Sequence, residues 1–450
     1  MNQEALLEQA QKIVDQAKPN EQIEVCCASS TSTKIRVYGG NVESLTQASN
    51  DSIGIRILSK GRQGFASTGS FSQAAIDKAF ADARDNSEFS ETDEDLILAE
   101  PDGVEPTQVD TWKESVLQKP TEEKVAIALE LEEKALAADK RITGVRVSSY
   151  SDGFSQVALA SSNGIAVTNR TTQAGAAIQV MSAQDSDTRS GFGFDGGLES
   201  AEIDIDVILD RAVNRALNML GSKQPDSQSV DLYLEPEKAA TFFSLIASML
   251  DGESVVKVRT PFANRVDESI AAESLFLYDD ATDKDSKAAA AFDGEGLATR
   301  RVSLIDAGVL QGFMHDTYSA KRIGSKSTGS ALRGVRGLPS PGPQALHVAA
   351  GAAGSEEEII SKIKNGVYVY DFAGLHSGVN TISGDLSLGV EGLMIRDGKI
   401  CESISECTIT STLQRMLLDI SAIGSTVKHL HSGVSTPPIV IKDIALSGAS

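Results

Sequence analysis

The strongest constraint on the fold is an order of predicted elements that occurs twice in the first half of the chain. A helical apolar face around Leu6–Ala17, ended by Pro19, is followed by five short β-type runs and then by a helix over Ser72–Arg84. The same order recurs between helices expected over Thr121–Ala138 and Asp206–Leu220. The ten strand candidates are Ile23–Ala28, Thr33–Tyr38, Asn41–Ala48, Ser52–Leu58, Gly64–Thr68, Thr143–Tyr150, Phe154–Ala160, Ile165–Asn169, Ala174–Met181 and Thr188–Phe194. We therefore expect a helix–five strands–helix unit that is duplicated over residues 2–85 and 121–220.

Two short similarities align the copies in the same order. Ser52-Ile-Gly-Ile-Arg-Ile-Leu58 matches Gly175-Ala-Ala-Ile-Gln-Val-Met181, and Arg62-Gln-Gly-Phe65 matches Arg189-Ser-Gly-Phe192. The acidic stretch Asn86–Thr111 between the copies carries two prolines, which predicts a connector that crosses the surface from one copy to the other.

The second half is richer in β-type runs and glycine. A strand is expected over Val230–Leu234 and a helix over Glu235–Leu250, and Asp306-Ala307-Gly308 and Arg396-Asp397-Gly398 predict tight hairpin turns. Further helices are expected over Thr317–Lys326, Ser355–Lys364 and Ser411–Ala422, further strands over Val367–Phe372, Gly389–Ile395, Lys399–Thr408 and Ile439–Leu446, and a loop over Arg333–Pro343. The polar segment Ser222–Ser229 predicts a boundary. The prediction is an α+β protein with an N-terminal α/β domain (1–225) and a β-rich C-terminal domain with a few helices (226–450).

Charge and hydropathy exclude several classes of protein. The chain has 41 Lys and Arg against 63 Asp and Glu, a formal net charge of −22, which disfavours nucleic-acid binding through the global field. No apolar run is long enough to span a membrane, and the N-terminus has Glu4 and Glu8 without an apolar signal region. We expect a cytoplasmic protein whose four cysteines are free thiols.

Several short motifs offer chemistry, but each also has a plain structural explanation. Gly191–Gly196 fits GxGxxG, yet the next expected helix begins too late to hold a pyrophosphate, so a glycine-rich strand end is expected there. His429-x-His431 could present two imidazoles on one face of a strand, although no third metal ligand is visible nearby in the sequence. Metal binding through His429 and His431 is therefore kept only as an alternative.

The segment Gly374–Asp385 is unusually polar for a connection between apolar strands. It contains three glycines with His376, Ser377, Asn380 and Asp385. A loop and a site are both compatible with this composition.

That segment also carries a resemblance to a known family. Leu375–Lys399 resembles the C-terminal signature of the TldD/PmbA family, closest to the PmbA (TldE) branch, also called modulators of DNA gyrase. Gly308–Arg322 and Pro438–Gly448 resemble further family segments. The resemblance covers nearly the whole chain and is most specific in its second half.

The resemblance implies a two-component, zinc-dependent cytoplasmic peptidase that acts on unfolded or short peptides. Its TldD-type subunit carries HExxxH on a helix and a cysteine near the C-terminus. The matching helix here, Glu235–Leu250, has no such motif, and Lys428–Val434 has no cysteine. The expectation is a subunit without zinc, partnered by a TldD-like chain that holds the zinc.

Two rival interpretations remain open. The chain could be a metallopeptidase in its own right, with a non-standard metal site of His429, His431 and a distant carboxylate. It could instead be a non-proteolytic regulator that binds DNA gyrase or a toxin–antitoxin complex.

For the preferred interpretation no catalytic residue is assigned to this chain. The residues expected to line a cavity shared with substrate or partner are those of the polar loop: His376, Ser377, Asn380, Gly384 and Asp385. Gly378 and Gly384 would let a peptide backbone approach closely, because no Cβ stands in the way.

Overall fold

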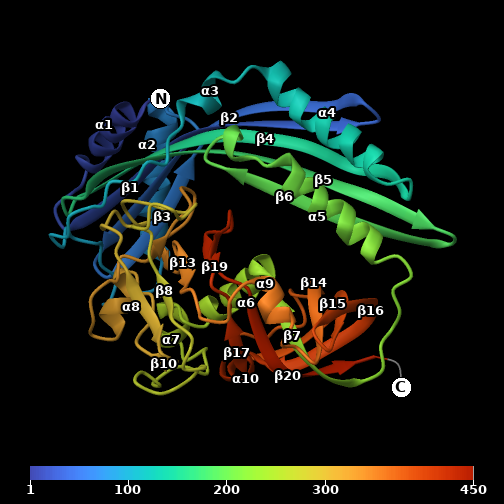
Figure 1. Cartoon of the computed structure of the whole chain (residues 1–450). Coiled ribbons are helices and arrows are strands. Elements are labelled where there is room, and N and C mark those ends of the chain that lie inside the picture. The colour runs from blue at the N-terminus through green and yellow to red at the C-terminus, as the bar shows by residue number, and fades with distance from the viewer. Residues whose placement is uncertain (449–450) are drawn as a thin grey trace.

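The N-terminal half is built on one antiparallel sheet of six strands, in the order β3-β2-β1-β4-β5-β6. The computed structural model describes residues 1–448 and confirms the α+β class. The strands are β1 (Glu21–Tyr38), β2 (Asn41–Ser59), β3 (Arg62–Thr68), β4 (Ile142–Ser161), β5 (Ala166–Gln184) and β6 (Asp187–Gly197). The sheet arches over the C-terminal half of the molecule (Figure 1).

Each predicted set of five strands is in fact three longer strands, so that part of the expected unit was wrong. The polar stretches around Ser30 and Asn50 looked like turns, but these two residues face each other in the β1–β2 ladder. Asp152 and Gly153 likewise continue through β4, and Arg170–Gln173 through β5. Backbone groups make the ladder hydrogen bonds, so a polar stretch stays in a strand wherever its neighbours continue the pairing.

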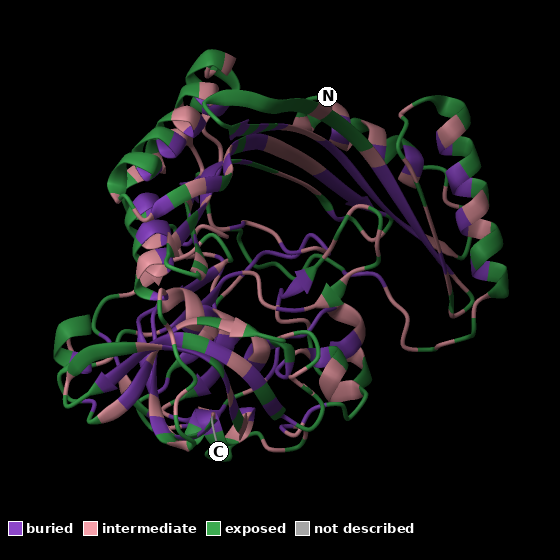
Figure 2. Cartoon of the chain, turned by 90° about the vertical axis from the view of Figure 1, so that its right-hand side faces the viewer, coloured by how far each residue is buried: buried purple, intermediate pink, exposed green. Residues whose placement is uncertain are grey.

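Four long helices cover one face of this sheet. They are α1 (Gln3–Val14), α2 (Gln73–Phe89), α4 (Thr121–Ala138) and α5 (Ile205–Asn218), with the short helices α3 (Glu114–Gln118) and η1 (Ser200–Glu202) beside them. Apolar residues of α1 and α2 pack on Ile55 and its neighbours, and those of α4 and α5 on Ile178 and its neighbours. The helices turn their buried residues to the sheet and their exposed residues outward (Figure 2). Burial of these apolar stripes is what fixes the helices on the sheet.

The two halves of the sheet share an equivalent close contact between a strand glycine and a helix. Gly64 of β3 faces Ile57 of β2, and Gly191 of β6 faces Val180 of β5. A Cβ on either glycine would lie 1.9 Å from a helix carbonyl oxygen, that of Ala83 in α2 or of Ala212 in α5. Gly191 therefore serves close helix–sheet packing within the literal GxGxxG run. The shared order of elements and this shared contact support the duplication over 2–85 and 121–220, which stays a proposal.

The C-terminal half contains two further six-stranded sheets and a two-stranded ribbon. One sheet has the order β16-β15-β14-β7-β20-β17, and an added β16–β20 pairing closes five of its strands into a ring. The other has the order β10-β9-β8-β13-β19-β18, and β11 pairs with β12. Their bounds are β7 (Gln228–Leu234), β8 (Leu277–Asp279), β9 (Val302–Asp306), β10 (Val309–Leu310), β11 (Ala331–Leu332), β12 (Ser340–Pro341), β13 (Leu346–Val348), β14 (Asn365–Ala373), β15 (Asp385–Arg396), β16 (Lys399–Thr412), β17 (Ile420–Ile423), β18 (Lys428–His429), β19 (Val434–Thr436) and β20 (Ile439–Ser447).

The C-terminal helices are mostly short. They are α6 (Pro236–Ser248), α7 (Gly252–Val256), α8 (Thr317–Arg322), α9 (Glu356–Ile360) and α10 (Leu413–Leu418). Both predicted hairpin turns are present, with positive φ at residues 307–308 and 397–398. Ser355 caps α9 in a capping box with Glu358. The helix expected over Ser411–Ala422 was too long, because β17 starts at Ile420 and pairs with β20.

The second face of the N-terminal sheet packs on the C-terminal half. Cys26 and Leu159 of the sheet share a buried cluster with Leu297 and with Ala99 of the connector. The prediction that the connector runs over the surface was therefore wrong in part, because Leu98 and Ala99 are buried between the halves. Among the helices of residues 1–448, none is long and apolar enough to cross a membrane.

Candidate functional site

The predicted site loop connects β14 to β15 and is exposed at most of its predicted site residues, whereas Gly384 is buried. His376, Ser377, Asn380 and Asp385 all lie at the surface. Asn380 Oδ1 accepts the backbone N–H groups of residues 382 and 383, and Ser383 Oγ donates to Asp385 Oδ2 over 2.6 Å. Hydrogen bonds within the loop thus satisfy some of its polar groups, while the side chain of His376 stays available at the surface.

The glycines of this loop are explained by contacts inside the chain. A Cβ at Gly378 would lie 2.0 Å from the carbonyl oxygen of Ser387. Gly384 has a φ of +85°, and a Cβ there would lie 1.8 Å from Gln414 Oε1. Close approach of a substrate backbone to these glycines stays a prediction.

Helix α6, which the resemblance matches to the zinc-binding helix, is an apolar core helix in this chain. Its buried residues are Ala239, Ala240, Phe242, Phe243, Ile246 and Ala247. Two carboxylates stand at its start, and both are paired: Glu235 with Arg215, and Glu237 with Arg211 and Lys428. Burial raises the pKa of Glu235; burial opposes ionisation of Glu237 too, yet Arg211 and Lys428 hold the pKa of that carboxyl below its usual range. A helix with no histidine and with neutralised carboxylates does not fit a catalytic zinc ion.

A different cluster in the same half brings together three possible metal ligands. His347 lies in β13, His429 in β18, and Asp283 in the segment that follows β8. One ligand atom from each of the three lies within 4.8 Å of the others. Strands β13 and β18 both border β19, so the order of the sheet makes this cluster from residues far apart in sequence.

The two imidazoles of the cluster are oriented by hydrogen bonds to other groups. His347 Nε2 lies 3.2 Å from the carbonyl oxygen of Asp280, and its Nδ1 lies 3.6 Å from Asp283 Oδ2. His429 Nδ1 lies 2.8 Å from Ser435 Oγ. The ring of His347 stacks on Tyr278, with ring centroids 5.1 Å apart. Burial lowers the pKa of His347, which favours the neutral imidazole that metals bind.

His431 is not part of this cluster, and metal binding by His429 together with His431 stays an alternative. The ring of His431 packs against Phe194 of β6, with centroids 5.4 Å apart. His429 and His431 both line a cavity of about 380 Å³ that lies between β6, α5, α6 and the segment 428–432. Sequence reasoning found His429 but missed His347 and Asp283.

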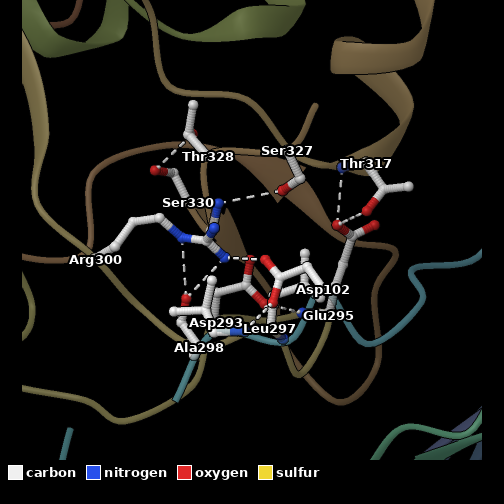
Figure 3. A network of polar contacts seen from close by, with 12 residues as sticks. Asp102, Asp293, Glu295, Leu297, Ala298, Arg300, Thr317, Ser327, Thr328 and Ser330 are labelled. Atoms are coloured by element: carbon white, nitrogen blue, oxygen red, sulfur yellow. Dashed lines mark hydrogen bonds and ion pairs between the residues drawn. The ribbon is translucent and has the colours of Figure 1, made fainter. Parts of the chain in front are cut away.

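A network of charged groups that includes the buried Asp293 and Glu295 lies next to α8 (Figure 3). Asp293 accepts backbone N–H groups of residues 295, 297 and 331. Glu295 accepts the N–H and hydroxyl of Thr317 through Oε2, while its Oε1 has no hydrogen-bond partner among the described residues. Burial raises the pKa of Asp293 to about 6 and that of Glu295 to about 8. Arg300 pairs with Asp102 of the connector.

A second buried group lies beside this network. Arg333 and Arg56 both face Glu24 of β1, with Arg56 Nη1 at 3.6 Å, and all three side chains are at most 3% exposed. Arg333 Nε and Nη2 and Arg56 Nη1 find no hydrogen-bond partner in the part of the chain that the structure describes. Buried charges of this kind hold their partners in one arrangement, because separating them would leave a charge without solvation.

These contacts border a large cleft between the halves, with a volume of about 1150 Å³. Its walls come from β2, β3, the connector, α7, α8 and residues 338–341. Both signs of charge line it, including Asp93, Glu94, Lys257, Arg259 and Arg322. A cleft of this size and mixed polarity has room for an extended peptide segment.

Three domain models of one family match the chain in order. They are described as PmbA/TldA metallopeptidase domain 1 over residues 23–87, the central domain over 114–220 and the C-terminal domain over 227–448.

Relatives and solved structures agree with this match. Metalloprotease PmbA of Escherichia coli is 23% identical, covering 94% of this chain and 92% of the relative, and a PmbA homolog of Haemophilus influenzae is 21% identical over 98% and 94%. A crystal structure described as a proposed modulator of DNA gyrase from Bacteroides thetaiotaomicron has a TM-score of 0.88 at 26% identity and covers 98% of both chains. TldE of Thermococcus kodakarensis has a TM-score of 0.87 at 24% identity and covers 99% of both.

Proposed function

Because the chain belongs to the PmbA/TldD metallopeptidase family, we propose that it is the subunit without catalytic zinc in a two-component peptidase. Its partner is a TldD-like chain that carries HExxxH and the zinc ion. The observation that carries this proposal is helix α6, which the resemblance matches to the family's zinc-binding helix and which has no histidine and no HExxxH motif. A peptidase zinc ion needs about three protein donors and an activated water, and α6 offers neither donors nor a free base.

The proposed role of this subunit is to hold substrate beside the partner's zinc. The cleft of about 1150 Å³ between the halves is the candidate channel for an unfolded or short peptide. Its mixed charges suit peptides of varied sequence, since neither sign dominates the wall. The net charge of −22 argues against nucleic acid as a direct ligand. We place the complex in the cytoplasm.

The polar loop Gly374–Asp385 is proposed to face the partner. His376 is exposed and Ile382 is 56% exposed, so the loop presents both a polar and an apolar group to a second chain. A TldD-like chain seated there would bury this surface and bring the loop to the shared cavity.

One rival function has a specific observation in its favour. The cluster of Asp283, His347 and His429 would give the chain a metal site of its own, as a self-sufficient metallopeptidase requires. The other rival is a regulator without proteolysis that binds DNA gyrase or a toxin–antitoxin complex. Only its gyrase part has a counterpart among the comparisons, in the descriptions of two solved structures.

Co-expression with a TldD-like chain tests the proposal. We expect a stable complex that cleaves unfolded casein, while either chain alone is inactive. A variant of the partner with HExxxH changed to AExxxA should bind this chain and lose activity. Full peptidase activity of the isolated chain, or failure to bind any TldD-like chain, would refute the proposal.

The loop is tested by the double variant His376→Ala/Asn380→Ala. It should fold and still bind the partner, while the complex cleaves peptides poorly. A matched control is Asp397→Ala in the β15–β16 turn, which is not part of the loop and should leave activity unchanged. Full activity of the complex with the loop variant would mean that the loop has only a structural role.

A further inference from the structure

We propose that Asp283, His347 and His429 bind one divalent transition-metal ion of the zinc class, at a site separate from helix α6. The three side chains come from three segments that the second C-terminal sheet brings together. Two imidazoles and one carboxylate are a donor set typical of zinc and related ions, with a fourth position left for water or another donor. The inference does not depend on the proposed function.

The orientation of His347 is the first argument. Its Nε2 faces the carbonyl oxygen of Asp280, which can only accept, so this nitrogen must carry the proton. The lone pair of Nδ1 then points toward the carboxylate of Asp283, 3.6 Å away. Two electron-rich groups at that distance repel unless a proton or a metal ion lies between them.

The fixed position of the His347 ring is the second argument. The ring is only 3% exposed and stacks on Tyr278, so its orientation is set by packing within the chain. A cation bound between Nδ1 and the carboxylate of Asp283 would relieve their repulsion. The backbone carbonyl on Nε2 is the outer contact that metal-binding histidines usually have, because it fixes the ring and raises its basicity.

His429 has the complementary arrangement. Its Nδ1 is engaged by Ser435 Oγ at 2.8 Å, which leaves Nε2 without a hydrogen-bond partner within residues 1–448. Each imidazole of the cluster thus has one nitrogen engaged elsewhere and one available as a ligand. Ser435 itself is buried in β19, so it holds this orientation firmly.

The spacing is close to what a small ion needs. Ligand bonds of about 2.0–2.1 Å in a tetrahedron put neighbouring donor atoms about 3.3 Å apart. The Asp283–His347 distance of 3.6 Å approaches this, and no separation between the ligand atoms exceeds 4.8 Å, so closing the site requires a movement of at most about 1.5 Å. Asp283 and His429 are partly exposed, which supplies both the freedom to move and a route for the ion.

Metal titration of the full chain tests this site. After treatment with a chelator, the chain is titrated with Zn²⁺ by calorimetry and with Co²⁺ by visible absorption. We expect one ion per chain and the intense absorption of four-coordinate cobalt. Asp283→Asn, which keeps the shape of the side chain, should weaken binding by at least about 10-fold, and Ser435→Ala by roughly the same factor.

His431→Ala is the matched control, because this histidine is two residues from His429 but faces Phe194. It should bind metal as the parent chain does. Circular dichroism of each variant verifies folding, and His429→Gln, which removes the second imidazole ligand, should also weaken binding by at least about 10-fold. Absence of saturable binding at one ion per chain, or equal weakening by His431→Ala, would overturn the site.

The same samples separate this inference from the proposed function. If the zinc-loaded isolated chain binds one ion and cleaves no peptide, both stand. If the zinc-loaded chain cleaves peptides and Asp283→Asn abolishes cleavage, the metal site is supported. The proposal that this subunit lacks catalytic zinc is then refuted.

Discussion

The two units of the N-terminal sheet share one plan but contact the C-terminal half in different ways. The first unit is joined by Glu24, Arg56 and Arg333, whose side chains are at most 3% exposed. The second is joined by Arg211 and Arg215 on the carboxylates at the start of α6, with side chains 12–25% exposed. The two copies of the unit are therefore held to the C-terminal half by charge pairs of different exposure. We call the buried group of the first copy the dry contact and the partly exposed pairs of the second copy the wetter contact.

The difference matters because charge pairs depend on their surroundings. Breaking a buried pair leaves a charge without water, whereas a pair near solvent is replaced by hydration. The wetter contact lies next to the proposed metal site, since Lys428, which pairs with Glu237, precedes His429. We expect substitutions at the second contact to change the free energy of unfolding only slightly, and substitutions at the first contact to lower it much more.

The largest effect is expected at the dry contact. Arg333→Met leaves Glu24 buried with only Arg56 at 3.6 Å, so it should lower the free energy of unfolding by about 3 to 5 kcal/mol. Denaturant titration measures this loss. Adding Glu24→Gln should recover part of it, because no unpaired carboxylate then remains. A loss below about 1 kcal/mol would mean that the contact is as wet as the second one.

The next effect is a pH dependence of the network around Glu295, which lies beside the dry contact. The pKa of Glu295 is raised from 4.5 to about 8, so its contribution to stability is complete below the unfolded pKa and is lost as the pH rises through the folded one. Raising the pH from 5 to 8 should cost on the order of 3 kcal/mol. Glu295→Gln, which mimics the protonated acid, should flatten that slope. An unchanged slope in this variant would assign the pH dependence to other groups.

A matched pair of glycine variants compares the units directly. In Gly64→Ala and Gly191→Ala the new Cβ would press on a helix carbonyl oxygen, so each should cost about 1 to 3 kcal/mol as the helix shifts from the sheet. Similar losses in thermal unfolding would support one duplicated unit. Gly144→Ala is the control, because no atom of residues 1–448 lies within 4 Å of its Cβ position. A large loss at only one of the two positions would weaken the duplication.

The smallest effect is expected at the wetter contact. Arg211→Gln removes one of two cations on Glu237, and Lys428 remains at 2.9 Å, so the loss should be about 1 kcal/mol or less. Raising the salt concentration should shrink this loss further, because screening acts on exposed pairs. A loss as large as that of Arg333→Met would erase the distinction between the two contacts.

Much of the fold is predictable because local signals agree with the tertiary structure. Helix α4 runs over Thr121–Ala138 as expected, and the turns at 306–308 and 396–398 have the positive φ that their residues favour. The strand count was wrong because polar residues such as Ser30 and Asn50 suggest turns, whereas pairing on both sides of β1 keeps them extended.

The metal cluster was not predictable to the same degree. His347 stands in the short apolar run Ala345–Ala350, which gives no sign of its partners. Only the parallel pairing of β13 with β19 and the antiparallel pairing of β18 with β19 bring it near His429. A histidine alone in a buried run is the one signal that could have drawn attention to it.

The central position of β1 and β4 has a consequence for synthesis on the ribosome. β1 pairs with β4 from Glu24–Ser161 to Val37–Ser148, more than 100 residues apart in the chain. The first unit can form its own sheet and helices as soon as it emerges, but one edge of β1 then stays unpaired until β4 follows. That edge is long and readily pairs with a second nascent chain. Slow elongation through the connector would therefore favour aggregation, and a chaperone that shields the edge would counter it.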